Sequence, residues 1–316
     1  MADLILHHFR VSPFSEKVRM VLAHKQLTWK SVIVPAIGPK PDVLALTGGY
    51  RKTPLLQIGA DVYCDTALIC DVLEHLQPAP TVYPEPGKGL ARILAQWADS
   101  TLFWAVVAGP KSAAHMQGGA LPEAAAAFAA DRAAMFGNMP RLRPADAAAA
   151  CKSYLRRLSD MLDGQPYLLG DRPCIADFAA YHPLWFTCTG MPAETSDLRH
   201  TPAVVGWMER MQAIGQRKLE EPFDAAQAIE VAANAEPAPM GQGYLRDSTF
   251  QDDHGIALGS QVTVAAESFG PEKTEGELLA ATRTHYSLRR TDERTGTVHV
   301  HVHFPRVGYV LERVEK

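Results

Sequence analysis

The sequence predicts three successive regions: an α/β unit, an all-helical region and a small β-rich tail. Up to about residue 80, short stretches alternate between the apolar patterns of strands and helices. Residues 88–225 carry alanine-rich, amphipathic stretches typical of helices. Beyond a linker at 235–243 with two prolines and two glycines, apolar residues recur with a period of two. We therefore expect units at residues 1–80, 88–225 and 244–316.

The first region reads β-α-β, a connection, then β-β-α. We expect strands at 4–8 and 29–34 on either side of a helix at 13–24. An irregular stretch rich in proline and glycine follows, then strands at 55–58 and 62–64 around a turn at 59–61. Leu68, Ile69, Val72, Leu73 and Leu76 share one face of a helix, since they follow a period near 3.6.

The second region contains helical patterns at 90–107, 122–137, 144–162, 175–188 and 203–214, and we expect no strand among them. In the tail, strands are expected at 261–266 and 299–304, with a turn at 292–296. The tail is small for an independent fold. We expect a small antiparallel sheet or open barrel that docks on the helical region.

Composition argues against several classes of protein. Of the 316 residues, 47% are hydrophobic and 21% charged, and the net charge is −4. Neither nucleic acid nor an anionic membrane is an expected partner, because both attract clustered Lys and Arg. We see no signal-peptide pattern and no run of ~20 apolar residues. Five cysteines without a CxxC pair are typical of reduced thiols. We expect a cytoplasmic protein.

Ser12 stands where the first predicted strand passes into the first predicted helix. It suits the N-cap, and Pro13 suits the first helical position. A helix N-terminus offers free backbone N–H groups and partial positive charge, so a thiol held there ionises more easily. The Ser12 hydroxyl could add a hydrogen bond to the resulting thiolate.

The run Ser12-Pro13-Phe14 followed by Val18-Arg19 resembles the thioredoxin-fold active site. It is similar to the serine-type glutathione transferases, the tau and zeta classes among them, over residues 1–225. The resemblance implies a thioredoxin-like domain, an all-α glutathione transferase domain and a Ser12 that stabilises the glutathione thiolate. The cysteine and tyrosine variants of the family do not match, because no Cys precedes the Ser-Pro pair and no Tyr precedes residue 50.

Two later motifs fall where this family has them. Thr53-Pro54 matches the cis-proline, and the resemblance implies that the Thr53 backbone pairs with the cysteinyl part of glutathione. Asp65-Thr66 matches the helix start that binds the γ-glutamyl carboxylate through backbone N–H and hydroxyl groups. Each motif alone has an ordinary structural explanation; their order and spacing carry the resemblance.

Lys52 resembles the basic residue that binds the glycine carboxylate in tau-type enzymes, and Lys40 is a second candidate. Taken singly, each is better explained as a plain solvated charge. Asp177 matches the family's buried helix start as a structural, capping-box acid. Cys174 replaces the usual hydroxyl residue there, which puts the side-chain N-cap hydrogen bond in doubt.

His299, His301 and His303 alternate, so they share one face of a predicted strand. Such a row could bind a metal, but alternate side chains on one strand lie ~7 Å apart, too far for three ligands on one ion. We expect a solvated or stacked face and no metal site.

The resemblance implies a glutathione-dependent transferase, of the detoxification type, whose thiolate attacks a small hydrophobic electrophile. Glutathione is then the co-substrate, and a homodimer is expected. Aromatic and Met side chains of the helical region would be core or pocket: Trp97, Phe103, Trp104, Phe128, Met135 and Phe136. The alternatives are a non-catalytic binding or interaction protein, and a glutathione-dependent isomerase or dehalogenase.

Overall fold

The computed structural model describes residues 3–109, 122–188, 197–216, 219–251, 253–296 and 299–314. Within them, ten strands form one mixed sheet in the order β10-β6-β7-β8-β9-β4-β3-β1-β2-β5. The sheet therefore joins the first and last regions of the sequence. No helix of the described residues is long and apolar enough to cross a membrane.

The first region folds as the expected α/β unit. β1 pairs in parallel with β2 and antiparallel with β3, and β3 pairs antiparallel with β4. Its elements are β1 (Ile5–His8), α1 (Pro13–His24), β2 (Trp29–Ile33), α2 (Pro41–Thr47), β3 (Leu55–Ile58), β4 (Asp61–Cys64) and α3 (Thr66–Leu76).

Helix α2 corrects the expectation of an irregular connection. Pro41 opens it at a first-turn position, and Gly48, with φ 81°, ends it. Val43 and Leu46 are buried against strands of the tail. Seven residues are too few to display a helical period, and the apolar partners of this helix come from distant sequence.

The second region is helical as expected. The stretch at 90–107 forms one run of three parts, because a π-helical segment lies between two α-helices. The elements are α4 (Lys88–Trp97), η1 (Ala98–Leu102), α5 (Phe103–Val107), α7 (Pro122–Phe136), α8 (Pro144–Met161), α9 (Ile175–Cys188), η3 (Asp197–His200) and α10 (Pro202–Gly215).

The chain then returns to the sheet, which corrects the expectation of no strand before residue 225. β5 (Glu220–Pro222) pairs in parallel with β2 at the sheet edge. α11 (Ala225–Ala233) follows, opened by a capping box between Asp224 and Gln227. Little in the sequence signals β5, since its three residues are two glutamates and a proline.

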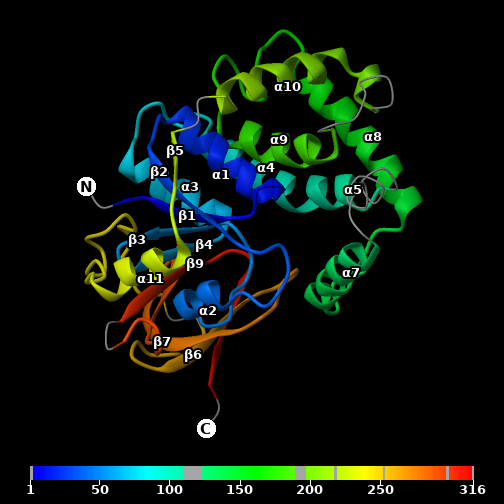
Figure 1. The fold of residues 1–316 in the computed structure, drawn as a ribbon. Helices are drawn as coiled ribbons and strands as arrows, with labels where there is room; N and C mark the ends of the chain where they lie inside the picture. The colour runs from blue at the N-terminus through cyan, green and yellow to red at the C-terminus, as the bar shows by residue number, and fades with distance from the viewer. Residues whose placement is uncertain are drawn as a thin grey trace.

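The tail forms the predicted β-rich extension, with elements β6 (Gln261–Ala266), β7 (Thr274–Ala281), β8 (His285–Arg290), β9 (Val300–Pro305) and β10 (Tyr309–Arg313). Its strands pair antiparallel with one another. The expectation that the tail docks on the helical region was wrong. The tail joins the α/β unit instead, because β9 pairs in parallel with β4. The tail thereby covers a strand edge that would otherwise expose unpaired backbone groups. Figure 1 shows the tail strands on the opposite side of the α/β unit from α8, α9 and α10.

Two main hydrophobic cores result. One joins α1 and α3 to the helical region, with Trp207 and Phe178 among its fully buried side chains. The other lies between α2, α11 and the tail strands and includes Leu46, Ile229 and Phe304. The tail thus shares a core with the α/β unit.

Asp177 has the structural role that the sequence predicted. Its buried carboxylate accepts hydrogen bonds from the backbone N–H groups of Leu168 and Cys174 and from Trp207 Nε1, each at 2.9 Å. The Cys174 thiol also donates to it, at 3.3 Å. Burial raises the pKa of Asp177. None of the four cysteines whose side chains are described is in a disulfide.

Replacing Asp177 by Ala should lower the free energy of unfolding by roughly 3–5 kcal/mol, because three buried N–H donors lose their acceptor. Asp171→Ala is the matched control: that carboxylate is exposed, so its removal should cost under about 0.5 kcal/mol. Urea denaturation measures both, and equal losses would contradict the assigned role.

His7 makes stability depend on pH. It is 1% exposed, its Nε2 lies 2.8 Å from Gln57 Oε1, and Gln57 Nε2 donates to the Ala228 carbonyl of α11. Burial lowers the pKa of His7 to about 4. An unfolded chain, with an imidazole pKa near 6.5, binds the proton first as pH falls. Stability is therefore lost below about pH 6.5.

From pH 7 to pH 5, His7 alone should cost about 2 kcal/mol of unfolding free energy. His7→Gln removes the titrating ring, so its free energy of unfolding should fall about 1 kcal/mol less per pH unit over this range, which corresponds to about 0.7 of a proton. Urea denaturation at several pH values gives the slope. Parallel slopes in the two proteins would contradict the assignment.

Candidate functional site

Strand register brings the predicted segments together at one end of strands β1, β3 and β4. The end of β1 lies opposite Leu55, the first residue of β3, and Leu55 lies opposite Cys64, the last residue of β4. Ser12 follows β1, Thr53 precedes β3 and Asp65 follows β4. The three segments therefore meet, although 53 residues of sequence separate the first from the last.

Ser12 caps α1 as predicted. Its backbone is extended, and its Oγ accepts a hydrogen bond from the Ser15 N–H at 3.2 Å. Because Oγ is the acceptor in this bond, the Ser12 hydroxyl proton stays available to another acceptor. The side chain is half-buried.

The other two segments also have unusual backbones. The Thr53-Pro54 peptide bond is cis, as the family resemblance implied. Asp65 has φ 73°, a left-handed conformation that is uncommon outside glycine. Its Oδ1 accepts the Ala67 N–H at 2.9 Å and so caps α3. Thr66, the first residue of α3, is buried. A left-handed conformation at a residue other than glycine is one of the conformations that cluster at functional sites.

A buried ionic network lies beneath the start of α3. Lys17 Nζ donates to Thr66 Oγ1 at 3.1 Å and pairs with Asp99, whose other oxygen lies 2.9 Å from His182 Nε2. Burial favours the neutral form of each group, but the attraction between the opposite charges has the larger effect on both pKa values. Asp99 raises the pKa of Lys17, and Lys17 and His182 lower the pKa of Asp99. The network joins α1 and α3 to η1 and α9 of the helical region.

Both predicted lysines donate to backbone carbonyls. Lys40 Nζ lies 3.2 Å from the Arg51 carbonyl oxygen, and burial lowers its pKa to about 8. Lys52 Nζ lies 3.0 Å from the carbonyl oxygen of Phe269, a tail residue. It also lies over the rings of Tyr50 and Tyr309, and burial lowers its pKa.

A row of aromatic rings starts two residues after Ser12. Phe14 packs on Phe103 with centroids 4.7 Å apart, and Phe103 contacts Trp104 at 4.9 Å. Trp104 then contacts both Phe136 and Phe269, at 5.1 and 5.3 Å. All but Phe103 are partly exposed. These rings offer an apolar surface beside Ser12.

The remaining predicted pocket candidates are not part of this row of rings. Trp97 packs edge-on against Tyr154, and Phe128 lies beneath the Arg132 guanidinium. Met135 is buried, and its carbonyl accepts the Gly270 N–H at 2.8 Å.

Sequence reasoning missed the tail residues at the site. The loop between β6 and β7 supplies Phe269, whose ring contacts Trp104 and whose carbonyl accepts a hydrogen bond from Lys52. Strand β10 supplies Tyr309, whose hydroxyl donates to Asp65 Oδ2 at 3.1 Å. Glu272 of the same loop pairs with Arg51. The contact from Tyr309 to Asp65 spans 244 residues. No local pattern marks it.

Two histidines of the predicted row join the sheet interface. His303 stacks on Tyr63 at 4.8 Å, and its Nε2 lies 2.9 Å from Asp61 Oδ1. The His301 ring lies beside that of His303, with centroids 6.2 Å apart. Stacking is one of the two arrangements that the sequence analysis left open; the other was a solvated face. Within the described residues, no three His, Cys, Asp or Glu side chains are grouped to hold a metal.

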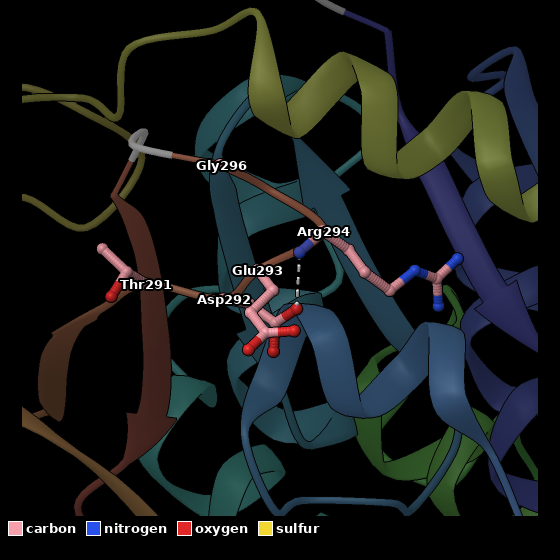
Figure 2. A pocket seen from close by; sticks show the side chains of 5 residues that line it. All are labelled: Thr291, Asp292, Glu293, Arg294 and Gly296. Carbon is pink, nitrogen blue, oxygen red and sulfur yellow. Dashed lines mark hydrogen bonds between the residues drawn. The ribbon is translucent and has the colours of Figure 1, made fainter.

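A surface hollow lies at the turn between β8 and β9. Thr291, Asp292, Glu293, Arg294 and Gly296 line it, as Figure 2 shows. These residues belong to a solvent-facing turn, and the Arg294 N–H donates to Asp292 Oδ1 within it. None of the predicted site residues lines this hollow, and we assign it no ligand.

Comparison with known proteins agrees with this geometry. Residues 6–81 match the family model for the glutathione S-transferase N-terminal domain, and residues 120–210 match that for the C-terminal domain. A GST-like protein from Pseudomonas syringae is 39% identical, with a TM-score of 0.80 over 99% of this chain and 100% of that one. The chain belongs to the glutathione S-transferase family.

Other relatives cover less of the chain. Glutathione transferase GSTFuA3 from Phanerochaete chrysosporium, 20% identical with a TM-score of 0.54, covers 67% of this chain and 97% of its own. Pyrimidodiazepine synthase of Drosophila melanogaster is 32% identical over 85 residues, 26% of this chain and 35% of that protein. This chain therefore matches about a third of that curated relative. As a glutathione S-transferase family member, the chain carries an additional β-rich extension, and the Pseudomonas protein matches it through that extension.

Proposed function

We propose that the protein binds glutathione along the sheet edge at Ser12, Thr53 and Asp65 and activates its thiol. The observation that carries the proposal is the convergence of a half-buried serine hydroxyl, a left-handed Asp65 and the N-terminus of α3. In a member of this family, that edge is the expected glutathione site.

The start of α3 suits the γ-glutamyl end. Lysine can only donate hydrogen bonds, so Thr66 Oγ1 accepts from Lys17 and its own proton remains free for a carboxylate. The helix N-terminus adds partial positive charge. The Asp65 carboxylate attracts the neighbouring ammonium of glutathione. Lys40 and Lys52 are the proposed partners of the glycine carboxylate, and the Thr53 backbone pairs with the cysteinyl unit.

Ser12 would lower the pKa of the glutathione thiol by donating its hydroxyl proton to the thiolate. The thiolate then attacks a small hydrophobic electrophile held against Phe14, Phe103 and Trp104. The thiol proton leaves to solvent, and the new bond joins the glutathione sulfur to an electrophilic carbon. The electron pair of the bond that breaks leaves with the displaced group or, in an addition, moves to the neighbouring atom, which takes a proton from solvent. No covalent enzyme intermediate forms. Proximity and thiolate stabilisation supply the rate enhancement.

A non-catalytic binding protein is the second candidate, because tail residues contact Lys52 and Asp65. Isomerase or dehalogenase chemistry would use the same glutathione site with a different second substrate. We also propose a cytoplasmic homodimer acting in detoxification; light scattering tests the dimer.

Thr66→Ala should weaken glutathione binding roughly 10-fold to 100-fold, since one hydrogen bond to a charged group is lost. Thr66→Ser keeps the hydroxyl and is the matched control. Isothermal calorimetry measures both before any electrophile is tried. Absence of binding to the wild-type protein would refute the proposed site.

Ser12→Ala should lower turnover roughly 10²-fold and change glutathione affinity little. Ser12→Asp separates the two roles of this residue, because Asp caps a helix as well as Ser but its carboxylate has no proton to donate. Low turnover is therefore expected in both variants, and Ser12→Thr should retain activity. Normal turnover in Ser12→Asp would leave Ser12 with capping alone.

A further inference from the structure

Tyr309, the first residue of β10, connects the tail to the proposed glutathione site. Its side chain is buried, with 5% of the residue exposed, and its hydroxyl donates to Asp65 Oδ2 at 3.1 Å. β10 pairs with β6, on the far side of the tail from β9 and β4. The tail sheet must therefore curve back toward the start of α3.

Asp65 is held from two directions. Its Oδ1 accepts the Ala67 N–H of α3, and its Oδ2 accepts the Tyr309 hydroxyl. A left-handed backbone is costly for a residue with a Cβ, so an unsupported Asp65 would gain by relaxing. Asp65 remains partly exposed, and each carboxylate oxygen has a second lone pair. The carboxylate can therefore accept from a ligand while both protein bonds persist.

The same ring also contacts the second charged residue of the proposed site. Lys52 Nζ lies 5.3 Å from the centroid of the Tyr309 ring and 5.2 Å from that of Tyr50. The Phe269 carbonyl is its hydrogen-bond partner. Gly270, with φ 72°, lets this loop pass, since a Cβ there would lie 2.9 Å from Lys52 Cδ. Tail residues thus contact Asp65, the proposed partner of the γ-glutamyl end of glutathione, and Lys52, a proposed partner of its glycine end.

We propose that Tyr309 is a positioning residue of the glutathione site, whose hydroxyl holds the Asp65 carboxylate where it receives the γ-glutamyl ammonium. The proposal rests on the proposed glutathione site. Without the hydroxyl, Oδ2 loses its fixed partner and the carboxylate points toward the ammonium for less of the time. Recognition of the glycine carboxylate and of the thiol does not depend on this bond.

The test combines Tyr309→Phe with a change in the ligand. The variant keeps the ring over Lys52 and removes only the hydroxyl. Calorimetry would compare glutathione with glutaryl-cysteinyl-glycine, which lacks the γ-glutamyl amino group. We expect the variant to bind glutathione roughly threefold to tenfold more weakly, which is the net contribution of one ordinary hydrogen bond, because the bond that is lost supports Asp65 and does not touch the ligand. Binding of the deaminated tripeptide should change less than about twofold.

Tyr286→Phe makes the same change at another buried tyrosine of the tail and should alter neither affinity. Thermal unfolding of each variant checks that it is folded. Equal weakening of both ligands by Tyr309→Phe would show a general structural role and overturn the proposal. Unchanged glutathione affinity would also overturn it and leave the site standing. A wild-type protein that does not bind glutathione would refute the proposed function itself.

Discussion

Parallel pairing of β9 with β4 is the interaction on which the rest of the architecture depends. It converts a short α/β sheet into a ten-stranded one and places the tail next to α2. The hydrogen bond from His303 to Asp61 and the stacking of His303 on Tyr63 reinforce this strand pair. From this position the tail supplies Tyr309 and Phe269 to the proposed site. A β module docked only on the helices would not bring β10 to Asp65.

Local signals predicted the elements that local interactions define. Ser12 and Pro13 mark the start of α1, and the structure begins that helix at Pro13. β3, α9 and β6 also have the bounds that the patterns indicated. α2 and β5 were missed because each is short and is stabilised by partners far away in sequence. The tail was placed on the wrong neighbour for a related reason: a period of two indicates a strand but does not name the strand it pairs with.

The candidate site divides in the same way. The meeting of the segments at Ser12, Thr53 and Asp65 follows from short motifs and sheet topology, and both could be read from the sequence. Lys17, Asp99 and His182 could not, since a buried lysine is recognisable only once its carboxylate partner is located. No sequence pattern indicated the contacts of the tail residues Tyr309 and Phe269 either. The motifs identified the residues proposed to contact glutathione. The residues that support them could be identified only from the structure.

The pairing of β9 with β4 also has a consequence for biosynthesis. The contact between Asp61 and His303 spans 242 residues, so a ribosome releases the α/β unit and the helical region well before the strand that completes the sheet. During that interval β4 is an edge strand with unsatisfied backbone groups, the kind of surface on which chains associate wrongly. Until β9 has been synthesised, that edge therefore has to be shielded by the rest of the fold or by another protein.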